Sequence, residues 1–213
     1  DSAQNLTPDN KATDTLPAAS PDGKYLAWVA MARPGYEADR QVLMLRDLKT
    51  DKVTALTQKW DRSVASIAWA LDGKSMLVTA GEILDTPLFR IDLKGKATRL
   101  TEEGHVGAAV PLKSGAVLYT MDTVRGPSEL YLREADGARR TLTAVNAGLF
   151  AEIDNVDVQR FDFKGANGDQ VWGQITKPAG AAGKLPVLLL VHGGPQGSFG
   201  DNWSFRWNPR VMA

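Results

Sequence analysis

The stretch Ser66–Thr101, SIAWALDGKSMLVTAGEILDTPLFRIDLKGKATRLT, decides the fold. A turn-forming tripeptide, Leu71-Asp72-Gly73, separates its first two apolar segments, and short polar segments separate the others. Apolar runs of this length bounded by turn residues predict strands joined by hairpins. We expect four strands, at 66–69, 75–80, 88–93 and 97–100. The stretch therefore predicts one four-stranded antiparallel sheet.

The same pattern recurs on both sides of this stretch. Leu56-Thr57, Leu100-Thr101 and Leu142-Thr143 each close a unit, at separations of 44 (100 minus 56) and 42 (142 minus 100) residues. The turn recurs in register as Ser20-Pro21-Asp22-Gly23 and as Lys113-Ser114-Gly115. Four-stranded propeller blades repeat every ~40 to 45 residues. The repeat therefore predicts three consecutive blades of a β-propeller.

The three blades are expected to occupy residues 1–146. Strands of the first unit are expected at 16–19, 25–31, 41–48 and 53–56. In the more degenerate third unit they are expected at 116–119, 129–132 and 139–142. Propellers usually need about four to eight blades to close, so we expect these to be the C-terminal blades of a ring whose other blades precede them.

The repeat stops after Asn146, and residues 147–157 have the composition of a connection between domains. Two alternating segments, 159–164 and 170–177, flank Ala166-Asn167-Gly168-Asp169. Alternation around an Asn-Gly pair is a strong signal for a β-hairpin. The hairpin is thus the first element expected beyond the blades.

The segment Leu185–Val191 is a continuous apolar run that leads directly into His192-Gly193-Gly194-Pro195. Such a run predicts a strand buried on both faces. A buried strand that ends in His-Gly-Gly-Pro is typical of the oxyanion loop of α/β-hydrolases. The plain alternative is a glycine turn leaving a strand. Under the hydrolase interpretation, residues 147–213 comprise a linker and the N-terminal part of an α/β-hydrolase domain.

Acyl transfer explains the residue types of this loop. The reaction places negative charge on a carbonyl oxygen, and a backbone N–H that approaches it closely is best supplied by a residue without a side chain. We therefore expect the backbone N–H of Gly194 to donate to the oxyanion. His192 is expected to shape the loop and not to move protons.

Composition excludes several classes of function. The 213 residues are 43% hydrophobic and 23% charged, with 25 basic and 25 acidic side chains. A chain without net charge is a poor partner for nucleic acid or a membrane surface. The absence of cysteine excludes disulfides and thiol catalysis.

No set of His, Asp and Glu has the spacing of metal ligands, so we expect neither a metal nor a cofactor. No signal peptide is visible at the N-terminus, and the composition does not identify the cellular compartment.

The segments His192–Gly200 and Trp203–Pro209 resemble the prolyl oligopeptidase family, within its branch of dipeptidyl peptidases and acylaminoacyl-peptidase-like enzymes. Arg33–Arg40 and Trp60–Ser63 are similar to propeller segments of the same enzymes. The resemblance implies a serine exopeptidase in which a propeller caps a Ser-Asp-His hydrolase domain and admits short peptides. It also favours a periplasmic or secreted protein over a cytoplasmic one.

The sequence departs from that family at the nucleophile. Gly-x-Ser-x-Gly is absent, and Gly197-Ser198-Phe199-Gly200 has the wrong spacing. Ser198 is therefore not expected to be the nucleophile, and His105 is expected to be a packed or solvated residue. The resemblance implies that the triad follows residue 213, so the 213 residues alone are expected to be inactive and to need the rest of the enzyme.

The longer loops of a blade are expected on one face, between strands two and three and between blades. We infer that this face is directed toward the hydrolase domain. An enzyme that removes dipeptides must hold a free α-amine, which has a pKa of ~7.7 to 8.0, and carboxylates are its natural partners. Glu37, Glu102 and Glu103 are the candidates. The alternatives for each are a solvated acid or an interdomain salt bridge.

Two other functions stay open. The chain could be a non-catalytic propeller that acts as an interaction module, but such a module has no need of His192-Gly193-Gly194-Pro195. It could also belong to an esterase-like hydrolase, which shares the loop chemistry but not the preceding blades. A homo-oligomer is possible under any of these interpretations.

Overall fold

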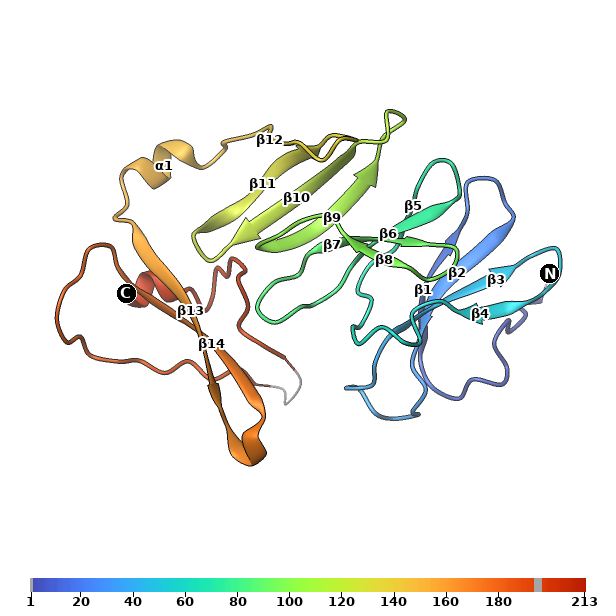
Figure 1. Cartoon of the computed structure of the whole chain (residues 1–213), viewed down its shortest axis with the longest axis horizontal. Helices are drawn as coiled ribbons and strands as arrows, with labels where there is room; N and C mark the ends of the chain where they lie inside the picture. Colours follow the sequence, from blue (N-terminus) through green and yellow to red (C-terminus); the bar gives the residue numbers. More distant parts are fainter. Residues whose placement is uncertain (1, 194–196) are drawn as a thin grey trace.

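The computed structural model describes residues 2–193 and 197–213 of the chain. These residues form three four-stranded antiparallel sheets and one two-stranded hairpin. Figure 1 shows the sheets following one another in chain order, with the hairpin beyond the third. In every four-stranded sheet each strand pairs with the next one along the chain, which is the up-and-down order of a propeller blade.

The strands of the blades agree closely with the predicted segments. The first sheet contains β1 (Asp14–Ala19), β2 (Tyr25–Ala30), β3 (Val42–Asp47) and β4 (Val53–Ala55). The second contains β5 (Ala68–Trp69), β6 (Ser75–Thr79), β7 (Leu88–Asp92) and β8 (Ala97–Arg99). The third contains β9 (His105–Pro111), β10 (Val117–Thr123), β11 (Gly126–Arg133) and β12 (Arg139–Thr141). The expectation of propeller blades is confirmed.

Two details of the third sheet differ from the prediction. The sequence predicted no strand at residues 105–111, where β9 lies, and its small residues and terminal proline have low strand propensity. It forms by pairing with β10, and such pairing overrides local preference. Strands β10 and β11 also extend beyond the predicted segments 116–119 and 129–132, and they continue toward each other until Thr123 pairs with Gly126.

The Leu-Thr repeat has a structural cause. The fourth strand of the first sheet ends at Ala55, and the Leu56 N–H still bonds to the Leu43 carbonyl at 2.8 Å. The Thr57 hydroxyl then accepts the Leu43 N–H at 2.8 Å. A side-chain oxygen thus replaces the strand carbonyl where the chain turns away toward the next blade.

The other two blades repeat this arrangement. The hydroxyl of Thr101 accepts the Leu88 N–H at 2.9 Å, and the hydroxyl of Thr143 accepts the Leu130 N–H at 2.9 Å. The first of these bonds is buried and the second is partly exposed. Because a buried N–H without an acceptor is costly, threonine is favoured at the end of each unit.

Two hydrophobic cores hold the sheets together. The first lies between sheets one and two, and the second lies between sheets two and three. Fully enclosed side chains include Leu43, Met76 and Ile91 in the first core and Leu88 and Tyr119 in the second. The Trp69 indole also donates to the Ala18 carbonyl at 2.9 Å. Every blade is therefore packed against its neighbour through side chains from the strands.

Beyond the blades lie α1 (Ala147–Ala151), β13 (Val156–Lys164), β14 (Gln170–Pro178) and α2 (Pro209–Met212), with a short 3-10 turn, η1 (Ala166–Gly168), at the hairpin tip. Asn167 and Gly168 have φ values of 60° and 79°. Positive φ at both positions is what an Asn-Gly hairpin turn requires. The predicted hairpin is confirmed.

The predicted buried strand at Leu185–Val191 is wrong for the described residues. The segment is not assigned to a strand, and Val187 and Leu189 are 92% and 79% exposed. A strand buried on both faces needs paired neighbours and covering layers. Among the described residues no strand pairs with this segment, so its hydrophobicity alone does not impose strand geometry.

Replacing Thr57 by valine should destabilise the first blade more than the equivalent change destabilises the third. Thr57→Val keeps the shape of the side chain and leaves the buried Leu43 N–H without an acceptor. We expect a loss of about 1–3 kcal/mol in the free energy of unfolding. Thr143→Val should cost less, because water can reach the partly exposed Leu130 N–H. Urea unfolding of both variants measures this, and equal losses would contradict the assigned role.

Candidate functional site

The long loops of the blades share one face, as predicted. Arg40, from the β2–β3 loop, donates to the carbonyls of Gln58 and Trp60 between the first two blades. Arg62, from the same inter-blade segment, pairs at 3.0 Å with Glu82 in the β6–β7 loop. These contacts join loops of both kinds across the first two blades. We call this surface the loop face.

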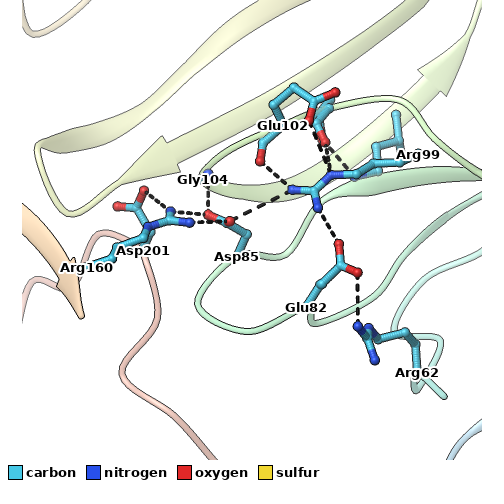
Figure 2. Close-up of polar contacts among 10 residues, drawn as sticks. Arg62, Glu82, Asp85, Arg99, Glu102, Gly104, Arg160 and Asp201 are labelled. Atoms are coloured by element: carbon cyan, nitrogen blue, oxygen red, sulfur yellow. Dashed lines mark hydrogen bonds and ion pairs between the residues drawn. The ribbon is translucent and has the colours of Figure 1, made fainter. Parts of the chain in front are cut away.

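The most enclosed charged contact on the loop face joins the second blade to the hairpin. The carboxylate of Asp85, in the β6–β7 loop, accepts two hydrogen bonds from the Arg160 guanidinium, at 2.6 and 2.7 Å. The Asp85 side chain is 5% exposed, and its carboxylate also accepts the Gly104 N–H at 2.9 Å. Figure 2 shows Arg160 approaching Asp85 from the hairpin side. The bonds to Asp85 raise the pKa of Arg160.

The Asp85–Arg160 pair belongs to a chain of alternating charges, which we call the charge chain. Arg99 contacts Glu82, lies 3.9 Å from Asp85, and donates to the Glu102 carbonyl. At the other end Arg160 also pairs with Asp201 at 3.2 Å. Its members, in order, are Arg62, Glu82, Arg99, Asp85, Arg160 and Asp201 (Figure 2).

The third blade contributes a second polar cluster to the loop face. The Asp122 carboxylate contacts His105 Nδ1 at 3.1 Å, accepts the Ser128 hydroxyl at 3.0 Å, and accepts the Trp203 N–H at 2.7 Å. A Ser, a His and an Asp meet here, but the serine donates to the aspartate. A catalytic triad instead needs the serine bonded to the histidine. The cluster therefore has the geometry of a structural contact.

Asp122 changes the protonation of His105. The hydrogen bond to Asp122 raises the pKa of His105 above its ordinary value of 6.5, against the opposing effect of burial. Burial alone would raise the pKa of Asp122, but the bonds from His105 and the Trp203 N–H outweigh it and lower that pKa below 3.8. The pair is therefore an imidazolium beside a carboxylate at mildly acidic pH.

The expected amine anchors lie on loops and are not brought together. Glu102 has a side chain 88% exposed and lies 3.8 Å from Arg99, while Glu103 is 60% exposed and lies 3.6 Å from Arg139. Glu37 lies in the β2–β3 loop and lines an open hollow of about 340 Å³ with Arg33 and Tyr36. Within the described residues, no hydrogen bond or salt bridge joins Glu37 to either of the other two. Their role as amine anchors stays a prediction.

The expected oxyanion loop is only partly described. Gly194 lies outside the described residues. His192 is exposed, with Nδ1 3.0 Å from the Gly193 carbonyl and its ring edge-on to Phe199 at 6.2 Å between centroids. The next segment lies on the second blade, where the Asp201 N–H donates to the Leu84 carbonyl at 2.6 Å.

Sequence reasoning missed the residues that carry the charged contact between blades and hairpin. Asp85 and Arg160 are 75 residues apart, and neither belongs to a motif. The one available signal was the predicted orientation of the loop face, which placed Asp85 in a loop directed toward the second domain. Arg160 lies in a predicted strand in which polar and apolar residues alternate. The pattern therefore does not distinguish it from a charged residue that is exposed to solvent.

Residues 2–193 and 197–213 contain no group of three or more His, Asp or Glu side chains arranged to hold a metal ion. Among the same residues no helix is long and apolar enough to cross a membrane.

The comparisons identify related proteins. No protein-family model matches the chain. It is 33% identical over 204 residues to dipeptidyl-peptidase 5 of Porphyromonas gingivalis, which covers 94% of this chain and 30% of that protein. It is 31% identical over 206 residues to a probable dipeptidyl-peptidase 5 of Aspergillus niger, covering 92% of this chain and 28% of that protein. The chain thus spans about 30% of the length of these relatives.

The structure of Pyrococcus horikoshii acylaminoacyl peptidase matches with a TM-score of 0.73 at 23% identity, over 88% of this chain and 29% of that one. The blades and this match place the chain in the class of β-propeller proteins. The sequence relatives place it more narrowly: the chain is homologous to about 30% of the length of the dipeptidyl-peptidase 5 proteins, and this supports its resemblance to the prolyl oligopeptidase family.

The stabilisation from His105 should depend on pH. A histidine whose pKa is raised in the folded state stabilises fully below its unfolded pKa, and the contribution is lost as the pH rises through the folded value. The difference in melting temperature between wild type and His105→Gln should therefore be largest below pH 6.5 and shrink at higher pH. Thermal unfolding across this range measures the difference. A difference that stays constant with pH would contradict the charged pair.

Proposed function

We propose that the chain is part of a serine exopeptidase that removes dipeptides from the N-terminus of short peptides. The observation that carries the proposal is the 33% identity to a dipeptidyl-peptidase 5, which extends over 94% of the chain and so includes both the blades and the segments beyond them. An interaction module would require only the blades. The similarity beyond the blades therefore favours the enzyme over the interaction module.

In this proposal the two parts of the chain have different tasks. The loop face of the blades limits the chamber that a peptide enters. The loop that starts at His192 supplies backbone N–H donors to the oxyanion of an acyl transfer. A Ser-Asp-His triad is supplied by residues outside these 213, since the chain contains no Gly-x-Ser-x-Gly.

The exposed segment Leu185–Val191 supports a larger second domain. Val187 and Leu189 expose most of their apolar surface, and a contiguous apolar run left in water is unfavourable. We propose that further strands and helices of the complete protein cover it, as the hydrolase interpretation of residues 147–213 requires. The short coverage of the relatives agrees with this proposal.

Labelling with a fluorophosphonate tests the serine mechanism. We expect the complete protein to be labelled and to release dipeptides from peptides with a free N-terminus, because the reagent traps an activated serine. The isolated 213 residues should not be labelled. Mass spectrometry locates the modified residue: labelling of Ser198 would contradict the proposal, and so would a complete protein that is neither labelled nor active.

Removing the charge of an amine anchor should lower activity on peptides with a free N-terminus more than activity on N-blocked peptides. Glu37→Gln, or the double change of Glu102 and Glu103 to Gln, should lower kcat/KM by roughly tenfold for peptides with a free α-amine. N-blocked peptides, which are acylaminoacyl substrates, should be affected less. Glu134→Gln is the matched control, because Glu134 lies at the β11–β12 turn on the opposite side of the blades and pairs with Arg140. Equal losses for both substrate types would make these acids structural.

A further inference from the structure

The segment that follows the expected oxyanion loop returns to the second blade. The rings of His192 and Phe199 lie edge-on, with 6.2 Å between their centroids. Directly after Phe199, the chain packs on the β6–β7 loop. The Asp201 N–H donates to the Leu84 carbonyl at 2.6 Å, and the Asp201 carboxylate accepts the Val124 N–H at 2.9 Å. The segment is thus attached to the second and third blades at once.

Gly200 shows how close this attachment is. A Cβ placed on Gly200 would lie 2.6 Å from the Leu84 carbonyl oxygen, well inside van der Waals contact. Glycine is therefore required here by the approach of two backbones, which no other residue permits without displacement. The attachment is therefore a direct backbone-to-backbone contact.

Arg160 holds the two carboxylates of this contact together. Asp85 and Asp201 are 5% and 13% exposed, and both lie within 3.2 Å of the Arg160 guanidinium. Two enclosed carboxylates repel each other unless a cation lies between them. Because Arg160 comes from β13, the cation also ties the hairpin to the same point.

Asp85 is also held by residues other than Arg160. Its carboxylate accepts the Gly104 N–H at 2.9 Å and lies 3.9 Å from Arg99. A carboxylate with these partners has little freedom to rotate. Its two oxygens are therefore held in the orientation that accepts both hydrogen bonds from the guanidinium. The position of Arg160, and through it that of Asp201, is therefore determined by the second blade.

We propose that Asp85 and Arg160 are positioning residues: they hold residues 197–203 on the second propeller blade, and these residues directly follow the loop that begins at His192. The proposal rests on the proposed function, because it assigns that loop to oxyanion stabilisation. Displacement of a catalytic group by ~1 Å can reduce the rate by ~10²-fold. Asp85 and Arg160 then contribute to catalysis without touching the substrate.

The test uses three variants of the complete protein. Arg160→Gln removes the cation, and Arg160→Lys keeps the charge but loses the bidentate bonds. Arg46→Gln is the matched control, since Arg46 pairs with Asp51 at 2.5 Å on the first blade and does not contact the charge chain. For each variant we would measure kcat and KM on a dipeptidyl ester, hydrogen exchange of the peptide covering residues 197–203, and the melting temperature.

We expect Arg160→Gln to speed hydrogen exchange of residues 197–203 and to lower kcat at least tenfold with KM changed less than threefold. Arg160→Lys should fall between this variant and wild type. Arg46→Gln should leave exchange and kcat within twofold of wild type. Faster exchange with unchanged kcat would overturn the proposal, because the attachment would then be structural. Unchanged exchange would overturn it as well.

Failure of this proposal can be told apart from failure of the proposed function. If the wild-type complete protein is neither labelled by a fluorophosphonate nor active on dipeptidyl esters, the function itself is wrong. If it is labelled and active, but Arg160→Gln behaves as Arg46→Gln does, only the positioning role is wrong.

Discussion

A threonine hydroxyl that accepts a backbone N–H is the contact on which the order of the blades depends. The last strand of each unit must end so that the chain can cross to the next blade, yet the third strand still presents an N–H at that point. Thr57, Thr101 and Thr143 satisfy this donor with a side chain. The chain is then free to leave the sheet without exposing an unpaired group to the core. The loops of the loop face start from these fixed points.

The repeat made most of the fold predictable, because its signals are local. The Asp-Gly turn at Gly73 and the Asn-Gly turn at Gly168 require positive φ, and both have it. Strand β9 lacked such a signal, and only its pairing with β10 makes it a strand. Leu185–Val191 shows the opposite case, since a run with strong strand character is not a strand where none of the described strands pairs with it.

The candidate site was predictable only in outline. The alternation of loops and turns placed the charged residues on the correct face, but a sequence does not state which charges meet. Glu102 and Glu103 were prominent because they are adjacent, and both are largely exposed. Asp85 was inconspicuous, yet it is the enclosed residue that contacts the hairpin. Long-range ion pairs depend on how elements pack, and no local pattern encodes them.

The alternation of the charge chain has a consequence for its electric field. On the blades Arg62 and Arg99 balance Glu82 and Asp85, while Arg160 balances Asp201 on the segments that contact them. Each side of the charge chain therefore carries no net charge, so its field decays faster with distance than that of a net charge. Beyond a screening length of ~8 Å at physiological salt, little attraction remains to guide one surface toward the other. The covalent connection through residues 142–155 must bring the two surfaces together, and the ion pairs then fix how they align once they are in contact.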